Sequence, residues 1–124
     1  GHRLLEAGFS VSYHRGAELE ALLRASQNPD SPTSLEELTQ RLADVDALIL
    51  DDLWATQSTE WALGQLETLL DRRYDSMALT VVVTNLPATE IERLSGRLYS
   101  RFRDVDVVVW VDMVAVPDYR QRAR

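Results

Sequence analysis

Two adjacent carboxylates, Asp51 and Asp52, follow directly on the continuously apolar residues 47–50. A short apolar run of this kind is typical of a strand buried on both faces in a parallel α/β sheet, and ligands of such sheets bind where the strands end. Two neighbouring carboxylates would repel each other there unless a positive group neutralised them, and a hydrated Mg²⁺ is the natural candidate. A buried strand that ends in a solvated acidic turn explains the same residues equally well.

The chain alternates between segments that predict strands and segments that predict helices, which indicates an α/β fold with a mostly parallel sheet. Ser34 and Glu37 form a capping box at the start of one helix. Helices are expected over residues 17–25, 34–43 and 59–74, with two short ones that begin at Pro87 and near Ser95, and strands over residues 9–13, 45–50, 79–83 and 107–111. Residues 9–13 alternate apolar and polar side chains, so this strand is expected near a sheet edge.

Composition excludes several classes of protein. The net charge of -7 argues against a nucleic-acid-binding surface that spans the whole chain, because such surfaces are normally basic. The chain has no cysteine, and hence neither a disulfide framework nor a thiolate metal site. No apolar run is long enough to span a membrane, so we expect a cytoplasmic protein that does not bind membranes.

The order of these signals resembles the core of an AAA+ ATPase. More narrowly, it is similar to the bacterial helicase loaders of the DnaC/DnaI type and to the related IstB-type transposition ATPases. Residues 48–53 resemble the Walker B strand of that family, residues 83–87 the end of its sensor 1 strand, and residues 97–102 its arginine-finger box. The resemblance covers nearly the whole chain and implies a three-layer α/β/α P-loop NTPase core.

The resemblance gives a role to each polar residue at the strand ends. Asp51 would hold Mg²⁺, often through water, and Asp52 would polarise the water that attacks ATP. Asn85 would bind the γ-phosphate or that water, with Thr84 as the second choice for contact with the nucleotide. The simpler explanation of Asn85 is a polar cap after a buried strand, in the turn before Pro87.

The resemblance also makes Arg101 the arginine that reaches the nucleotide of a neighbouring subunit and stabilises transition-state charge there. Arg97, one turn earlier, and the nearby Arg103 are alternatives for the same role. A surface arginine that pairs with Asp104 or Glu92 is the simpler explanation.

One departure from the family is serious. These ATPases carry a G-x-x-x-x-G-K-[ST] phosphate loop before the first core helix, whereas this chain has no lysine and no such glycine pattern. We therefore expect residues 1–124 to be a single partial AAA+ domain, from the end of the first core helix to the C-terminus, without the first strand and the phosphate loop. The alternative is a protein that has lost its nucleotide site.

The expected function of the intact protein follows from the resemblance. It would bind and hydrolyse ATP with Mg²⁺, assemble as a homo-oligomer, and load or remodel a replicative helicase on single-stranded DNA. The alternatives are an IstB-like transposition helper and a non-catalytic α/β interaction module. Arg120 matches the short C-terminal ending of the family, although a solvated basic tail explains it more simply.

The missing first strand leads to an expectation about the sheet. In AAA+ domains that strand lies between the strands that correspond to residues 79–83 and 107–111. Each unpaired buried backbone group costs about 1–3 kcal/mol, so both strands are expected to find new partners. They pair with each other, with a strand of another chain, or with a segment outside this sequence. Pairing of Val82 with Val108 is the contact that would mark the first case.

Overall fold

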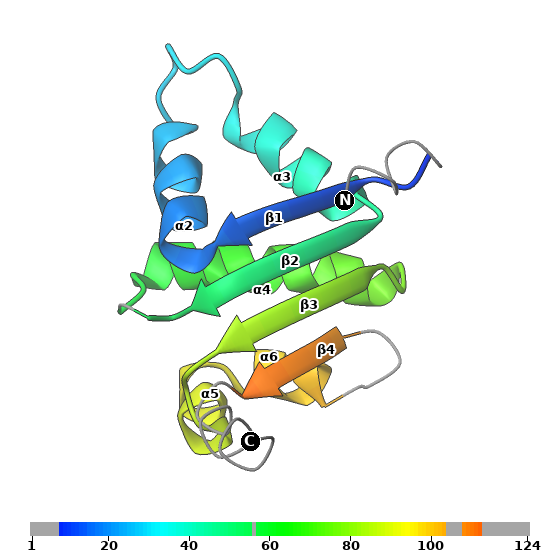
Figure 1. Cartoon of the computed structure of the whole chain (residues 1–124). Coiled ribbons are helices and arrows are strands. Elements are labelled where there is room, and N and C mark those ends of the chain that lie inside the picture. The colour runs from blue at the N-terminus through cyan, green and yellow to red at the C-terminus, as the bar shows by residue number, and fades with distance from the viewer. Residues whose placement is uncertain (1–7, 56, 104–107, 113–124) are drawn as a thin grey trace, which may run out of the picture.

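The computed structural model describes residues 8–55, 57–103 and 108–112 of the chain (Figure 1). Strands and helices alternate along it, as the sequence predicts. The strands are β1 (Val11–Arg15), β2 (Ala47–Leu53), β3 (Leu79–Thr84) and β4 (Val108–Asp112), and the helices are α2 (Gly16–Ala25), α3 (Leu35–Asp44), α4 (Glu60–Asp75), α5 (Ala88–Leu94) and α6 (Gly96–Phe102).

The described strands form one parallel sheet in the order β1-β2-β3-β4. The predicted α/β class with a parallel sheet is therefore confirmed, and β1 lies at a sheet edge as expected. The strand boundaries differ from the prediction by up to three residues, most at β1 and β2. β1 begins two residues later than expected, and β2 continues beyond Leu50 through both acids to Leu53.

β3 and β4 pair directly with each other, so in this structure no gap is left between them. The expectation that the two strands find a partner is confirmed, in the form in which they close on each other. The specific contact was wrong by two residues, because Val82 lies opposite Trp110 and Val108 lies opposite Thr80. Direct pairing satisfies backbone groups that would otherwise be buried without partners.

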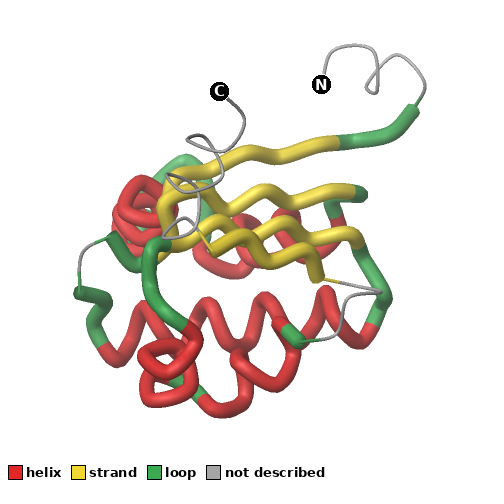
Figure 2. Tube along the Cα trace, turned by 60° about the horizontal axis from the view of Figure 1, so that its bottom comes forward, coloured by secondary structure: helices red, strands yellow, loops and turns green. Residues whose placement is uncertain are grey.

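One face of the sheet carries the core. Leu48, Leu50 and Val82 on this face are fully buried and belong to the same cluster as leucines of the helices. Figure 2 shows the described helices gathered on one side of the strands. The described residues thus form two layers, and the three-layer arrangement implied by the resemblance is not seen in them.

Hydroxyl side chains cap the amino-terminal ends of three helices. Ser34 accepts a hydrogen bond from the backbone N–H of Glu37, Thr59 from that of Ala62, and Ser95 from that of Leu98. Each cap satisfies one of the N–H groups that a helix start leaves without a partner. The Ser34 half of the predicted capping box is thus confirmed, whereas the Glu37 carboxylate accepts a hydrogen bond of 3.2 Å from the Ser34 hydroxyl instead of the Ser34 backbone N–H.

Arg73 of α4 is fully buried beneath the amino-terminal ends of β2 and β3. Its guanidinium donates to the hydroxyl of Thr80 and to five backbone carbonyls, at distances from 2.7 to 3.4 Å. The carbonyls are those of Leu42, Ala43, Val45, Asp46 and Leu79. Burial lowers the pKa of Arg73, whereas the carboxylates of Asp46 and Asp44 raise it.

We expect Arg73→Lys to lower the free energy of unfolding by about 3 kcal/mol, because one ammonium cannot replace a planar fork of five donors and leaves buried carbonyls unpaired. Arg72→Lys is the matched control, since Arg72 is the exposed neighbour and donates to the side chain of Gln40. Urea unfolding followed by circular dichroism measures both. Equal effects of the two substitutions would contradict the structural role of Arg73.

Candidate functional site

The two acids lie at the carboxyl end of β2, where the strand departs from regular geometry. The pairing register with β3 shifts between Leu50 and Leu53. Asp52 and Trp54 both have positive φ, of 53° and 63°. Such a conformation is rare for a bulky residue, and backbone strain of about 1–3 kcal/mol per residue is typical of functional segments.

Both carboxylates are held by side chains of the neighbouring strand β1. The phenol of Tyr13 donates a hydrogen bond to Oδ2 of Asp51. Nη2 of Arg15 lies 2.8 Å from Oδ2 of Asp52 in an ion pair. Each acid therefore has its own partner on β1, and the two are not directed at one common group. Tyr13 and Arg15 were not identified from the sequence. Their proximity to the acids depends on the strand register, which places Arg15 opposite Asp51.

Gly16, the first residue of α2, lets the helix start in close contact with the end of β2. A Cβ at this position would lie 3.0 Å from Cα of Leu53 and 3.3 Å from the carbonyl oxygen of Asp52. Helix α2 can thus begin directly against the irregular end of β2 only because position 16 has no side chain. Gly16 also escaped the sequence analysis, in which the helix was expected to begin at residue 17.

The donor set at the acids fits a hydrated Mg²⁺ in part. Mg²⁺ is usually held by one or two carboxylates together with water and phosphate oxygens, so Asp51 alone would suffice as a protein anchor. Among the described residues no group of three or more His, Cys, Asp or Glu could hold a metal ion. Any magnesium at this site would therefore take most of its ligands from water and a nucleotide.

Thr84 and Asn85 end β3 at the same edge of the sheet. Thr84 is fully buried; its hydroxyl donates to the carbonyl of Leu53 over 2.8 Å and accepts from the N–H of Leu86 over 3.1 Å. These bonds tie the end of β3 to the end of β2. Asn85 is exposed immediately after this link. The structure thus brings Asp52 and Asn85 to adjacent strand ends, and Thr84 holds those ends together.

Trp54 packs into the core beside the acids. The residue is 7% exposed, and its ring centre lies 6.1 Å from that of Phe102. Within the described part of the chain its indole N–H has no hydrogen-bond partner. The loop also borders a cavity of about 270 Å³, lined by Trp54, Ala55, Gln57, Ser58, Leu86, Glu90 and Leu94.

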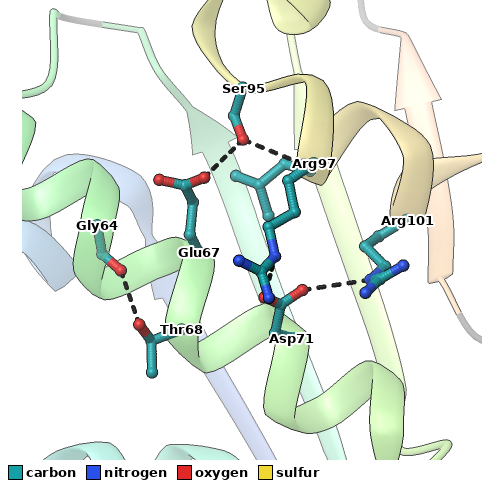
Figure 3. A network of polar contacts seen from close by, with 8 residues as sticks. Gly64, Glu67, Thr68, Asp71, Ser95, Arg97 and Arg101 are labelled. Atoms are coloured by element: carbon teal, nitrogen blue, oxygen red, sulfur yellow. Dashed lines mark hydrogen bonds and ion pairs between the residues drawn. The ribbon is translucent and has the colours of Figure 1, made fainter.

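The predicted arginines lie on α6 and contact α4 (Figure 3). Nε of Arg97 lies 2.5 Å from Oδ2 of Asp71, and Nε of Arg101 lies 3.2 Å from Oδ1 of the same carboxylate. The guanidinium of Arg101 also stacks 4.4 Å above the ring of Tyr74. The simpler explanation expected Arg101 to pair with Glu92 or Asp104, but Arg101 pairs with Asp71 instead. Asp104 itself lies outside the described residues.

The remaining candidates are placed as follows. Arg103 follows α6 with its guanidinium 5.8 Å from the ring centre of Tyr99. Arg120 lies outside the described residues, so its role stays a prediction. None of the described helices is both long and apolar enough to cross a membrane.

Comparison with known proteins finds a distant relative but no matching family. No protein-family model matches the chain. The chain is similar to YdaV of Escherichia coli K12, described as an uncharacterized protein, with 32% identity over 96 residues. The aligned region covers 77% of the chain but 38% of YdaV, so the chain spans well under half of this relative's length. The similarity supports a shared α/β domain and names no activity.

The contact of Tyr13 with Asp51 can be tested through the phenol. The hydrogen bond to Asp51 raises the pKa of Tyr13 above its usual value of about 10, and burial and the negative charge of Asp51 add to the increase. This interaction stabilises the fold below that pH and is lost as the pH rises through the pKa of the folded state. We expect Asp51→Asn to lower the pKa of Tyr13.

Carbon NMR of ¹³Cζ-labelled tyrosine, titrated with pH, measures this change. Asp30→Asn is the control, because Asp30 lies in an exposed loop remote from β1 in the sequence. An unchanged pKa of Tyr13 in Asp51→Asn would show that the contact does not form in solution.

Proposed function

We propose that this chain is the carboxyl-terminal part of an AAA+ ATPase of the helicase-loader type. In the intact protein Asp51 would hold Mg²⁺ through water, Asp52 would polarise the attacking water, and Asn85 would bind the γ-phosphate or that water. The protein would assemble side by side and load or remodel a replicative helicase on single-stranded DNA. An IstB-like role in transposition would use the same residues.

The observation that carries this proposal is the common edge of the sheet. Asp52 at the end of β2 and Asn85 at the end of β3 are brought to neighbouring strand ends by the hydrogen bond between Thr84 and Leu53. Ligands of parallel α/β sheets bind at this edge. The strained backbone at Asp52 and Trp54 lies at this same edge of the sheet. Backbone strain of this kind is typical of functional segments.

A second candidate function is favoured by a different observation. Arg15 and Tyr13 already occupy the carboxylates of Asp52 and Asp51, so the pair can persist without any bound cation. A non-catalytic α/β interaction module with a saturated acidic edge would have this arrangement. Hydrolysis measurements distinguish the two candidates.

The 124-residue chain alone is expected to release no phosphate from ATP at a useful rate. It has no lysine and no phosphate loop, so the backbone N–H groups and the cation that cradle a triphosphate are missing. A steady-state phosphate-release assay with Mg²⁺ checks this. Turnover by the chain alone that vanishes in Asp52→Asn would mean that the site is wrongly described.

In the product of the complete reading frame, Arg101→Ala is expected to lower hydrolysis by about 10³-fold or more and to leave ATP binding nearly unchanged. A cation supplied to a neighbouring subunit acts on the transition state formed there. Mixing this variant with Asp52→Asn protein is expected to restore part of the activity, since each supplies what the other lacks.

Arg93→Ala is the matched control, because Arg93 lies on the adjacent helix α5 and pairs with Glu90 at the surface. It is expected to keep full activity. If the two defective proteins show no recovery at any mixing ratio, the site is not shared between subunits. If the wild-type product itself does not hydrolyse ATP, the non-catalytic module is the better description.

A further inference from the structure

Asp71 stands between the two arginines of α6 and contacts both. One oxygen of its carboxylate faces Arg97 and the other faces Arg101, at 2.5 and 3.2 Å (Figure 3). The Asp71 side chain is 14% exposed, whereas those of Arg97 and Arg101 are 64% and 31% exposed. A largely buried carboxylate thus holds two more exposed cations at the surface.

The atoms used in these contacts decide what the arginines can still do. Both guanidinium groups face Asp71 through Nε, on the side edge of the fork. Within the described part of the chain the terminal Nη1 and Nη2 groups of Arg97 and Arg101 make no hydrogen bond. These terminal groups form the edge that matches carboxylate and phosphate oxygens in paired hydrogen bonds.

Further contacts of α4 fix the helix that carries the arginines. Glu67 accepts a hydrogen bond of 2.8 Å from the hydroxyl of Ser95, which in turn caps the first turn of α6. Tyr74 lies beneath the guanidinium of Arg101. Glu67, Asp71 and Tyr74 are spaced four and three residues apart and therefore share one stripe of α4. This stripe sets both the position of α6 and the direction of its arginines.

We propose that Asp71 is a positioning residue that holds Arg97 and Arg101 by their Nε edges and presents their terminal N–H groups to the nucleotide phosphates of a neighbouring copy. This inference rests on the proposed function and deepens it, since it names the residue that prepares the arginines for the shared site. Holding a flexible side chain in advance removes an entropic cost from the reacting complex.

The surrounding charges indicate that the anion must arrive with a partner. The groove beside Arg97 is lined by Gly64, Glu67, Thr68, Asp71, Arg72, Asp75 and Arg97. Its acids outnumber its arginines, so this groove does not attract a free phosphate ion. A nucleotide held by a second copy brings its own Mg²⁺ and its own binding energy, which lets the arginines act on it without binding it alone.

The test uses Asp71→Ala and Asp71→Asn in the product of the complete reading frame, with Asp75→Ala as the matched control. Asp75 lies one turn further along α4 in the same groove and makes no ion pair with a described residue. We expect Asp71→Ala to lower kcat by about 100-fold with little change in KM, because misplacement of a reacting group acts on the transition state. Asparagine keeps the size of the side chain and one acceptor, so Asp71→Asn is expected to show a smaller loss.

A positioning role is separated from a merely structural one by two further measurements. In the Arg97→Ala/Arg101→Ala background, Asp71→Ala is expected to cause no additional loss of activity. In the 124-residue chain, the ¹⁵Nε–H signal of Arg101, which donates to Asp71, is expected to exchange slowly with water, to lose this protection in Asp71→Ala and to keep it in Asp75→Ala.

The outcomes distinguish this inference from the proposed function. A wild-type product that does not hydrolyse ATP contradicts the proposed function, and the inference falls with it. An active wild type in which Asp71→Ala and Asp75→Ala behave alike contradicts the inference alone. An unprotected Nε–H signal of Arg101 in the wild-type chain, or a further loss of activity when Asp71→Ala is added to the double variant, also overturns it.

Discussion

The buried guanidinium of Arg73 is the interaction on which the arrangement of the sheet depends. It gathers backbone carbonyls from the end of α3, the start of β2 and the start of β3 around one cation. Buried carbonyls and a buried charge are each costly alone, and each offsets the cost of the other here. Because Ala47 and Leu79 begin their strands opposite each other, fixing these starts also fixes which residues of β2 and β3 meet at the far edge.

Helix α4 connects the two polar regions of the molecule. It begins at Glu60, capped by Thr59, after the loop that follows the acids, and its inward side carries the buried Leu66, Leu70 and Arg73. Its other side holds α6 through Asp71. The helical period separates these functions, since residues three or four apart share a face and residues two apart do not. One rigid element therefore relates the position of the arginines to that of the strand ends.

Much of the fold follows from local patterns, whereas the contacts of the site do not. Apolar periodicity and hydroxyl caps predict the helices to within about one residue at each end, because these signals act over a single turn. The partners Tyr13 and Arg15 lie 38 and 37 residues from the acids they hold, and that contact exists only once β1 and β2 pair in one register. The positive φ of Trp54 runs against its local preference, and its ring packs 6.1 Å from that of Phe102, a contact that only the tertiary fold provides.

The acid pair shows how such a register determines chemistry. Successive side chains of a regular strand point to opposite faces, and the left-handed backbone at Asp52 changes the direction of its carboxylate further. Asp51 thus meets a phenol and Asp52 a guanidinium, so the two negative charges are given to different donors. This separation lowers their mutual repulsion. It was this repulsion that led the sequence analysis to expect a cation at the acids. The pairing of the edge strand β1 is therefore a part of the candidate site, and any cation that binds the acids has to be accommodated beside Arg15.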